Sequence, residues 1–224
     1  MADIIRSAAL RVPHGFLTAA QSDAGHMHLA VGDMPVARVK QVHSAVALGL
    51  VRPFPDCDRP EADAMVIDNA RCALAIVTAD CAPVLFADEQ AGVIAAAHAG
   101  WRGAQAGIIA NTVRQMEAQG ARRSRIVAAI GPCIAQANYE VGADMRDCFT
   151  KEDARFFTEG TNNKWQFDLA GYVASKLEQA EVGEIDALRI DTYAGESGFH
   201  SYRRATHRGG PTDGRQFSLI ALPD

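Results

Sequence analysis

The sequence predicts an α/β fold, a single domain in which a mixed β-sheet is flanked by helices. Short apolar runs rich in Val, Ile and Ala recur along the chain, and Gly, Pro or Asp flanks most of them, which is typical of strands. Two longer segments have helical periodicity instead. Hairpin turns and helical crossovers both join the runs, which favours a mixed sheet. A chain of 224 residues is within the range of one α/β domain, which we expect to span 1–224.

Eight apolar runs are expected to be strands. In chain order they are VARVKQV (36–42), ADAMVID (62–68), CALAIVTA (72–79), PVLFAD (83–88), GVIAAAHA (92–99), RIVAAIG (125–131), ALRIDTY (187–193) and QFSLIAL (216–222). The segment DEQAG lies between two of these runs and is expected to be a hairpin turn. The proline-rich segment 52–63 is expected to be a surface loop between two strands rather than a domain boundary.

Two helices are expected. The first begins near Arg102 and runs through GIIANTVRQMEAQG, with Gly120 as the residue that ends it, because glycine readily adopts the left-handed conformation at a helix C-terminus. The second begins after Asp168, whose side chain can accept a hydrogen bond from the first turn, and it stops at Gly183.

The charge balance and the apolar pattern argue against several classes of function. Acidic residues number 27 and basic residues 22, for a net charge of −5, whereas nucleic-acid-binding domains usually have a basic surface. The densest basic run, 122–125, is interpreted as a solvated turn before a strand. No apolar stretch approaches the roughly 20 residues of a membrane helix, and the N-terminal pattern is not that of a signal peptide. We therefore expect a cytoplasmic monomer or homodimer without nucleic-acid or membrane partners.

The chain has five cysteines, an odd number without the spacing of a disulfide framework. They are Cys57, Cys72, Cys81, Cys133 and Cys148. In a reducing compartment they are expected to be free thiols, of which one or two take part in chemistry. Cys133 follows Gly131 and Pro132 at a strand end, ahead of Tyr139 and Glu140, and is interpreted as a buried thiol.

Three residues at the ends of expected strands are candidate metal ligands. His43 ends one run, Cys81 follows another directly after Asp80, and His98 comes near the end of a third. Their intervals are too wide for the close ligand pairs of a zinc finger, but they suit a catalytic site assembled from separate strands. Two imidazoles and one thiolate leave a fourth tetrahedral position for water or substrate. The carboxylate of Asp80 is a candidate for orienting one of the histidines.

The residues alone leave a plainer alternative open. A histidine or cysteine at a strand end is more often a hydrogen-bonded core residue than a ligand, and three such residues need not meet. Asp80 is equally suited to a cap or a turn. Strand ends therefore indicate a metal site without establishing it.

Basic residues near the HAGWRG loop and near the C-terminus are candidate substrate contacts. Gly100 and Gly103 are expected to allow tight backbone turns on either side of Arg102, and the N-terminus of the following helix attracts anions such as phosphate. Arg102 is equally suited to a structural ion pair. Arg203 and Arg204, at an expected strand end, would hold a carboxylate, ribose or phosphate if they faced the same cleft, and would otherwise form a solvated edge.

Taken together, these motifs resemble the laccase-domain, or YfiH-like, family of bacterial proteins. The segments KQVHS, ADAMV, TADCAPVLF, AAAHAGWRG, AIGPCI, YEV, SYRR and TDGRQ occur in this order, and the resemblance runs from His14 to nearly the C-terminus. TADC and HAGWRG together are highly specific, whereas QVH alone would be weak. The resemblance implies an α/β fold similar to the cysteine-hydrolase fold of a bacterial deamidating toxin.

The resemblance also implies a site and an activity. One zinc ion would be held by the histidine of QVH, the cysteine of TADC and the histidine of HAGWRG, which are His43, Cys81 and His98, and these would be the catalytic residues. The implied reactions are phosphorolysis of adenosine, inosine and methylthioadenosine, and deamination of adenosine. The expected partners are therefore a small-molecule nucleoside and phosphate, with Arg102 and Arg203 as candidate substrate-binding residues.

Two segments depart from the family pattern. The HGF-x-T motif is present at 14–18, but the Gly-Gly-Val-Ser that usually follows is missing, and the segment 19–38 is divergent. Near the C-terminus, the usual Cys-Thr is Asp191–Thr192, the usual Phe-Phe-Ser-Tyr-Arg-Arg has His200 as its second residue, and the turn 205–211 is longer than the usual hairpin. These departures leave the three ligands in place and put the substrate pocket in question.

Three other functions stay open. Two histidines and a cysteine also suit copper, and members of the family have been called polyphenol oxidases. Multicopper laccases rely on repeated His-x-His pairs, however, and this chain has one, His26–Met27–His28. Without a metal, Cys81 as nucleophile and His98 as base suit an amidase or deamidase, for example in peptidoglycan precursor editing. The last alternative is a non-enzymatic module that binds a cell-wall precursor.

Overall fold

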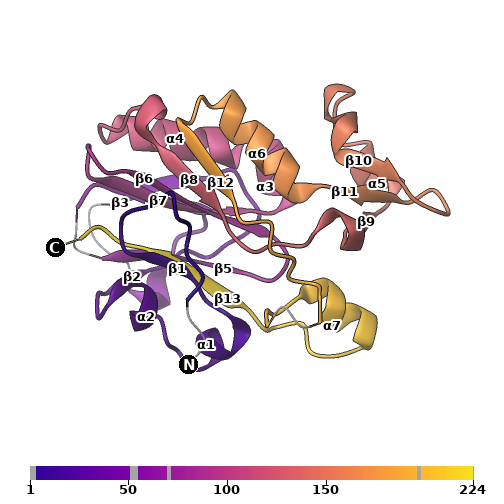
Figure 1. The fold of residues 1–224 in the computed structure, drawn as a ribbon, viewed down its shortest axis with the longest axis horizontal. Helices are drawn as coiled ribbons and strands as arrows, with labels where there is room; N and C mark the ends of the chain where they lie inside the picture. The colour runs from indigo at the N-terminus through magenta and orange to yellow at the C-terminus, as the bar shows by residue number, and fades with distance from the viewer. Residues whose placement is uncertain (1–3, 51–54, 70–71, 196–197, 224) are drawn as a thin grey trace.

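The computed structural model describes residues 4–223 except 51–54, 70–71 and 196–197 (Figure 1). Its strands form three sheets, of six, four and three strands. A mixed α/β fold is therefore confirmed, but the single sheet expected from the sequence is wrong, because the strands divide between stacked sheets. The similarity to the cysteine-hydrolase fold stays a prediction. Throughout the described part of the chain, each helix is too short or too polar to span a lipid bilayer.

The six-stranded sheet lies in the middle of the fold, in the order β12-β8-β6-β7-β4-β3. Its strands are β3 (Ala47–Leu50), β4 (Ala64–Ile67), β6 (Ala82–Asp88), β7 (Val93–Ala99), β8 (Val127–Ile130) and β12 (Glu184–Ala187). The central strands β6 and β7 pair antiparallel, across the hairpin turn expected at DEQAG. At the two edges, β3 pairs with β4 and β12 pairs with β8 in parallel, so the sheet is mixed as predicted.

The four-stranded sheet, in the order β1-β13-β5-β2, packs against one face of the six-stranded sheet. Its strands are β1 (His14–Phe16), β2 (Val36–Ala37), β5 (Ala73–Thr78) and β13 (Gln216–Ile220). The short helices α1 (Ala19–Asp23) and α2 (His28–Val31) lie on its outer side, at the bottom of Figure 1. Strand β5 ends at Thr78, so the four-stranded sheet fixes the start of the short segment that leads to Cys81.

Helices cover the other face of the six-stranded sheet (Figure 1). They are α3 (Trp101–Ala106), α4 (Ile108–Ala118) and α6 (Leu169–Gln179). Because side chains alternate along a strand, β6 turns Val84 and Phe86 towards the helices and Leu85 and Ala87 towards the second sheet. One hydrophobic core therefore lies beneath the helices and another between the two sheets, which fixes the strand ends that carry the candidate site.

The remaining elements are a small sheet and several short helices. A small sheet, in the order β10-β11-β9, contains β9 (Glu140–Val141), β10 (Phe157–Glu159) and β11 (Trp165–Phe167). The helices α5 (Ala143–Arg146) and α7 (Tyr202–Arg208) complete the α-helical elements. Single 3-10 turns occur at Asp56–Asp58, Arg123–Arg125, Gln136–Asn138 and Glu152–Phe156. The turn at Arg123–Arg125 precedes β8, as the basic run predicted, with Arg125 ion-paired to Asp88 at 2.8 Å.

The first expected helix is present but broken. Gly107 adopts a φ of 99°, which ends α3 and starts α4. Gly120 ends α4 as predicted, in a left-handed conformation with a φ of 98°. The N–H groups of Gly120 and Ala121 bond to the carbonyl oxygens of Glu117 and Met116, which is the pairing of a Schellman motif.

The second expected helix is also confirmed at its start and corrected at its end. Asp168 caps α6, since its side chain accepts a hydrogen bond of 2.9 Å from the N–H of Gly171. The helix ends at Gln179, earlier than the Gly183 predicted, because Glu181 adopts a left-handed φ of 59°. Gly183 instead packs against the carbonyl group of Ser124.

Three other expectations are wrong. VARVKQV is a strand only at Val36–Ala37, and ALRIDTY contributes only Ala187, because β12 lies before it. The segment 205–211 is not a hairpin, since its first residues continue helix α7. The expected loop 52–63 does join β3 to β4 and includes a 3-10 turn, although residues 52–54 lie outside the described part of the chain.

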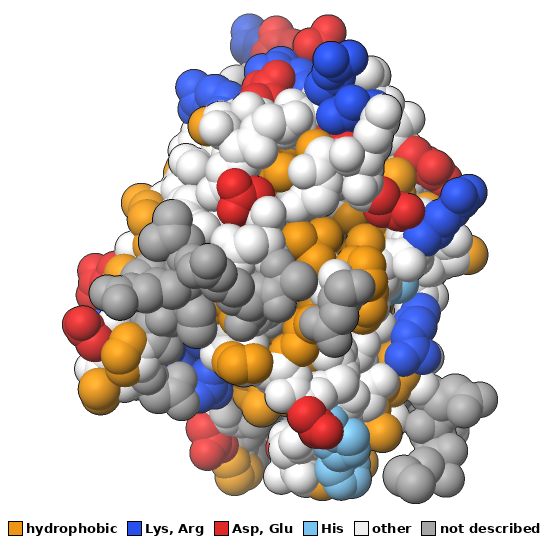
Figure 2. All heavy atoms as spheres, turned by 90° about the vertical axis from the view of Figure 1, so that its left-hand side faces the viewer, with side chains coloured by type: hydrophobic (Ala, Val, Ile, Leu, Met, Phe, Trp, Pro, Cys, Tyr) orange, Lys and Arg blue, Asp and Glu red, His pale blue; other side chains and the backbone are white. Residues whose placement is uncertain are grey.

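Figure 2 shows the face that is turned to the left in Figure 1. Acidic and basic side chains are interspersed over its described part, where charges of one sign do not gather into a broad patch, and hydrophobic side chains gather near the middle. Several basic side chains do line one pocket of the protein, which is described below.

Candidate functional site

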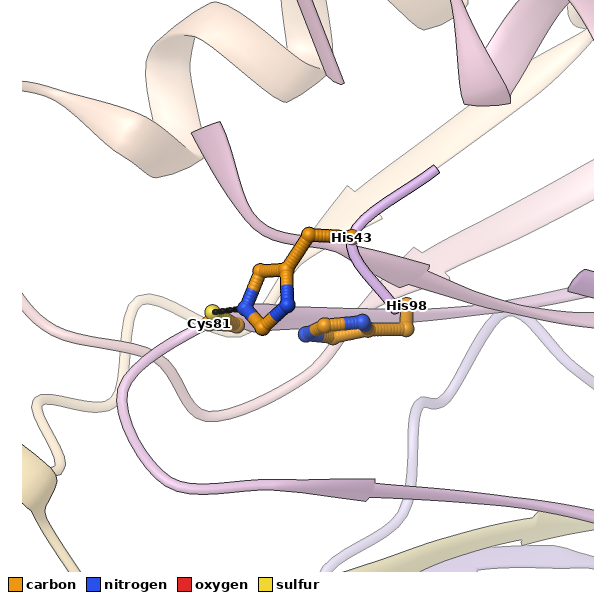
Figure 3. Close-up of side chains that lie close together, drawn as sticks. All are labelled: His43, Cys81 and His98. Carbon is orange, nitrogen blue, oxygen red and sulfur yellow. Dashed lines mark hydrogen bonds between the residues drawn. The ribbon is translucent and has the colours of Figure 1, made fainter. Parts of the chain in front are cut away.

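His43, Cys81 and His98 converge at one end of the six-stranded sheet (Figure 3). Cys81 lies between β5 and β6, and His98 is the penultimate residue of β7, which pairs with β6. His43 lies in the loop between β2 and β3, not at the end of a long strand as expected, and its backbone has a φ of 61°. The prediction that these three side chains meet is therefore confirmed, although one of them is carried by a loop.

The nitrogen and sulfur atoms of the three side chains lie within 4.8 Å of one another. Sγ of Cys81 is 3.9 Å from Nε2 of His43, and the two imidazole rings lie edge-to-face with centroids 4.7 Å apart. His98 is buried, whereas His43 is exposed at the mouth of the cluster. The cluster therefore has one side open to solvent.

The three donors fit a zinc-like ion. Tetrahedral zinc, with bonds of about 2.0–2.1 Å to nitrogen and 2.3 Å to sulfur, needs donor atoms about 3.3–3.6 Å apart. The 3.9 Å between Sγ of Cys81 and Nε2 of His43 is close to this spacing, and the three donors, which lie within 4.8 Å of one another, would move inwards to bind the ion. Imidazole and thiolate are also the donors that zinc and copper prefer. Among the residues that the structure describes, this is the one such group of His, Cys, Asp and Glu side chains.

Asp63, a residue that the sequence did not single out, organises both histidines. Its carboxylate is fully buried, and Nδ1–H of His98 donates to its Oδ1 at 2.8 Å. The backbone N–H groups of Val42, His43 and Ser44 all donate to the same carboxylate, at 2.6–3.2 Å. The hydroxyl of Ser44 donates as well, at 2.8 Å. Asp63 therefore fixes the loop that carries His43 and leaves Nε2 of His98 for a metal.

Asp80 does not orient a histidine, which corrects the expectation from the sequence. Its side chain accepts hydrogen bonds from the hydroxyl of Thr192 at 2.7 Å and from the backbone N–H of Arg203 at 2.7 Å. It therefore ties the C-terminal segment to the loop that carries Cys81. The signal for Asp63 was present in the sequence as an acidic residue inside the apolar run ADAMV.

The electrostatics of the cluster favour a thiolate. Burial raises the pKa of Cys81, but hydrogen bonds and charge from His43 and His98 outweigh burial and lower the pKa of the thiol to about 6. Burial likewise opposes the charge of His98, yet the hydrogen bonds to Asp63 and Cys81 raise the pKa of His98 above its ordinary value. A thiolate is the form of cysteine that binds metals and acts as a nucleophile.

The cluster opens into a pocket of about 840 Å³, which lies in the upper part of the usual range for small-molecule sites. Arg102 and Arg203 line this pocket together with the three cluster residues. The guanidinium of Arg102 stacks over the ring of Trp101, at 4.5 Å from the centroid. Arg102 makes no ion pair with any described residue, so the alternative of a structural ion pair finds no support in this part of the chain.

The paired arginines of SYRR have different surroundings. Both lie in the first turn of α7, and Arg203 lines the pocket with its guanidinium over the ring of Tyr139. Arg204 instead donates to the backbone carbonyl oxygens of Thr192, Tyr193, Ala194 and Phe199. Arg204 is therefore an anchor for the segment before α7, and only Arg203 faces the site.

Comparison with known proteins gives the family. A family model described as multi-copper polyphenol oxidoreductase laccase matches residues 20–223. The chain belongs to this laccase-like family. It is 41% identical over 188 residues to a protein of Deinococcus radiodurans named purine nucleoside phosphorylase, across 84% of this chain and 70% of that protein.

Two further members support the assignment. A protein of Escherichia coli named purine nucleoside phosphorylase YfiH is 34% identical over 200 residues, which cover 86% of this chain and 77% of the relative. The crystal structure of YlmD from Geobacillus stearothermophilus has a TM-score of 0.78 and 28% identity, and the match covers 91% of this chain and 78% of that one. The resemblance to the YfiH-like family is therefore confirmed.

The segments in which the chain departs from the family pattern do not form the wall of the pocket. Its lining consists of Val39, Lys40, Gln41, His43, Cys57, Arg59, 77–81, His98, Arg102, Ile134, Tyr139, Leu169, Tyr202, Arg203 and Arg215. The divergent segment 19–38 and the segment 205–211 are absent from the described lining. The family's pocket can therefore be retained in this chain despite these departures.

The glycines of HAGWRG are needed for packing rather than for turning. Gly100 has an ordinary φ of −70°, but a Cβ there would lie 2.9 Å from Sγ of Cys81 and 2.9 Å from Cδ2 of His43. A Cβ on Gly103 would lie 2.8 Å from the carbonyl oxygen of Ser44. The family motif therefore lets the N-terminus of α3 approach the cluster closely.

Gly100→Ala is expected to weaken metal binding by about tenfold or more while the fold is retained, because a methyl group would displace two of the three donors. A competitive titration with a chromogenic chelator measures the affinity. Gly210→Ala is the matched control, since the nearest heavy atom to a Cβ there is 3.9 Å away. Unchanged affinity in Gly100→Ala would show that the donors do not hold the ion in this arrangement.

Cys133 is a buried thiol, as interpreted from the sequence. It is 4% exposed, and burial raises the pKa of its thiol to about 12. Tyr139 lines the pocket, and burial raises its pKa as well. A protonated, enclosed thiol is not poised for nucleophilic chemistry, so of Cys81 and Cys133 only Cys81 is a reactive candidate.

Proposed function

We propose that this chain is a metal-dependent purine nucleoside phosphorylase. The observation that carries the proposal is the convergence of His43, Cys81 and His98 in a pocket that Arg102 and Arg203 also line. Relatives that match most of the chain are named purine nucleoside phosphorylases, which supports the same reaction class. In that reaction the bond between C1′ and the base nitrogen breaks, a phosphate oxygen bonds to C1′, and the base leaves with a proton.

The residues of the pocket have separate roles in this proposal. Arg102 and Arg203 bind phosphate, because guanidinium groups form charge-assisted hydrogen bonds with its oxygens. Asp63 holds His98 and the His43 loop in place, and His43, Cys81 and His98 hold the metal. When bound, the metal supplies Lewis acidity and an open coordination position. We propose zinc, which suits two imidazoles and a thiolate, with copper as the second choice.

The substrate range follows the family resemblance. We propose adenosine, inosine and methylthioadenosine as substrates for phosphorolysis, together with deamination of adenosine in the same pocket. The cationic pocket lining also favours an anionic co-substrate such as phosphate.

We also propose that 1–224 acts as one domain. The hydrophobic core beneath the helices and the core between the two sheets both pack on the six-stranded sheet, which supports this proposal.

Arg102→Ala separates the two reactions. Phosphorolysis needs an anion next to the sugar, and one charge-assisted contact contributes roughly 1.5–3 kcal/mol. We expect the apparent affinity for phosphate to fall by roughly one to two orders of magnitude. Conversion of adenosine to inosine without phosphate should change little, because it consumes only water. Steady-state kinetics at varied phosphate concentration measure both. Equal damage to the two reactions would place Arg102 in the fold or against the nucleoside.

A second candidate function is a cysteine-dependent amidase or deamidase. The specific observation in its favour is the lowered pKa of Cys81, about 6, next to His98, which Asp63 orients. In this alternative the thiolate of Cys81 attacks an amide carbon, the amine leaves with a proton from His98, and water hydrolyses the thioester. A peptidoglycan precursor is the proposed substrate, and binding of such a precursor without turnover is the non-enzymatic form of this alternative.

Chelation and alkylation distinguish these two candidates. We expect a chelator to abolish nucleoside phosphorolysis and added zinc to restore it. Iodoacetamide should have little effect on the zinc-loaded protein, because a metal-held thiolate is shielded, whereas a free catalytic thiolate is reactive. Mass spectrometry of Cys81 reports its modification, with the exposed Cys148 as the internal control. Rapid alkylation with loss of activity, and no effect of chelation, would favour the amidase.

Copper-dependent polyphenol oxidation has less support in the described residues. The rings of His26 and His28 lie 5.7 Å apart at the start of α2, but they are not part of a three-ligand group among the described residues. A multicopper site needs several such groups, and the described part of the chain contains one. We therefore keep a single metal ion as the proposal.

A further inference from the structure

The charge of the pocket differs from the charge of the whole chain. The chain has a net charge of −5, yet the lining contains the cations Lys40, Arg59, Arg102, Arg203 and Arg215. Of these, Lys40 is paired with Glu61 at 2.8 Å. Asp80 is the one carboxylate of the described lining, and it is already bonded to Thr192 and to the backbone of Arg203. A cleft lined by one sign of charge concentrates ligands of the opposite sign. The pocket is therefore suited to more negative charge than a neutral nucleoside carries.

Two of these arginines are held in place without being neutralised. Nη1 of Arg203 donates to the carbonyl oxygen of Glu140 at 2.8 Å, and Nη1 of Arg215 donates to those of Thr212 and Gly214, each at 2.7 Å. Neither makes an ion pair with a described residue. Carbonyl groups thus fix each guanidinium and leave its charge for a ligand.

Arginines outside the pocket are treated differently. Arg123 pairs with Glu117 at 2.9 Å, and Arg125 pairs with Asp88 at 2.8 Å. Each of those guanidinium groups is neutralised by a carboxylate and has a structural role. The contrast indicates that the uncompensated charge of Arg203 and Arg215 is a local feature of the site and does not reflect a general lack of acidic partners.

Arg215 lies on a different part of the lining from the phosphate-binding pair of the proposed function. Arg102 and Arg203 share the wall that contains Tyr139, and both affect its titration. Arg215 directly precedes β13, whose first residue, Gln216, pairs with Thr78 of β5. Thr78 also lines the pocket, and its buried hydroxyl has no hydrogen-bond partner among the described residues. Arg215 and Thr78 thus both line the pocket near the end of β5, and the hydroxyl group of Thr78 is not used by a described residue.

We propose that Arg215 and Thr78 form a second anion subsite, which binds a phosphate group carried by the nucleoside itself. The inference rests on the proposed function and extends its substrate class to purine nucleoside 5′-phosphates. Phosphorolysis of such a substrate breaks the bond between C1′ and the base and joins C1′ to inorganic phosphate. The base leaves with a proton, and the sugar product carries phosphate at both C1 and C5. Arg102 and Arg203 hold the attacking phosphate, and Arg215 holds the substrate's own.

Binding measured without turnover tests this subsite. Calorimetric titration of the metal-loaded protein in phosphate-free buffer compares inosine with inosine 5′-monophosphate. We expect the 5′-monophosphate to bind at least about tenfold more tightly than inosine. In Arg215→Ala this ratio should fall by about tenfold or more and approach one, the effect of losing one charge-assisted contact. Arg208→Ala removes a nearby cation of α7 that does not line the pocket and should leave the ratio as it is.

Each outcome supports or overturns the proposal. Equal binding of the two ligands, or an equal loss of both in Arg215→Ala, overturns it. A titration with inorganic phosphate alone tests whether the subsite binds free phosphate. If Arg215→Ala weakens the binding of inorganic phosphate but not that of inosine 5′-monophosphate, the assignment to a nucleotide phosphate fails. If inosine 5′-monophosphate binds through Arg215 but no base is released from either ligand, the subsite stands and the proposed function fails. If inosine is phosphorolysed but inosine 5′-monophosphate binds no more tightly than inosine, the proposed function stands and the subsite proposal fails.

Discussion

Replacement of Cys81 by alanine is expected to remove stoichiometric metal and to abolish nucleoside phosphorolysis. Zinc sites in small peptides bind with about 10–16 kcal/mol, so one of four ligands contributes about 2.5–4 kcal/mol, or about two to three orders of magnitude in affinity. The thiolate is the strongest of the three donors, and His43 and His98 alone leave the ion two imidazoles. Elemental analysis of the purified variant should therefore find well under one equivalent of zinc, against about one in the unaltered protein.

A second thiol provides the control for this experiment. Cys133→Ala removes a buried cysteine of the same pocket region that is not one of the three donors. Its zinc content and its activity per folded protein should match those of the unaltered chain. If Cys81→Ala kept full zinc, and His43→Ala and His98→Ala did as well, the three residues would not be the ligands.

Asp63→Asn is expected to have the second largest effect, on both metal affinity and stability. The carboxylate accepts five hydrogen bonds and donates none, so either orientation of an asparagine amide would direct N–H groups against N–H or O–H donors. Loss of the partner that orients a metal-binding histidine typically costs 10–100-fold in affinity, which we expect here. Breaking a buried pair with His98 also costs about 3–5 kcal/mol in the free energy of unfolding.

Ser44→Ala distinguishes positioning from general destabilisation. This change removes one of the five donors to Asp63 and leaves the contacts of both histidines intact. We expect it to lower the urea midpoint somewhat and to change zinc affinity by less than about threefold. Chelator titration and urea unfolding of both variants provide the comparison. If Ser44→Ala and Asp63→Asn lowered zinc affinity equally, Asp63 would have only a structural role.

The elements that could be predicted from the sequence are those fixed by local interactions. The β6–β7 hairpin follows from two apolar runs around DEQAG, and Asp168 and Gly120 act at helix ends through contacts with neighbouring residues. Elements whose conformation depends on residues distant in the sequence could not be predicted. VARVKQV alternates like a strand, but beyond Ala37 the chain bends into a loop that Asp63 and Gln41 fix, with Gln41 bonded to the backbone of Val77.

The candidate site shows the same limit. Its three donors carry recognisable side-chain chemistry and could be named from residue type and motif. The role of Asp63 depends on backbone N–H groups of a distant loop, and nothing in the residue types marks those donors. The sequence points to Asp80 instead, because Asp80 is adjacent to Cys81 in the chain, although its side chain bonds to Thr192 and to the backbone of Arg203. Adjacency along the chain is therefore a poor guide to the residues that support a site.

The most direct test of the proposed function is the fate of inosine with the metal-loaded protein in the presence and absence of phosphate. Inosine is chosen because deamination cannot contribute to its turnover. Chromatography should show hypoxanthine and ribose 1-phosphate in equal amounts, and no hypoxanthine when phosphate is omitted. Intact inosine under both conditions, or release of hypoxanthine with free ribose whether or not phosphate is present, would contradict the account.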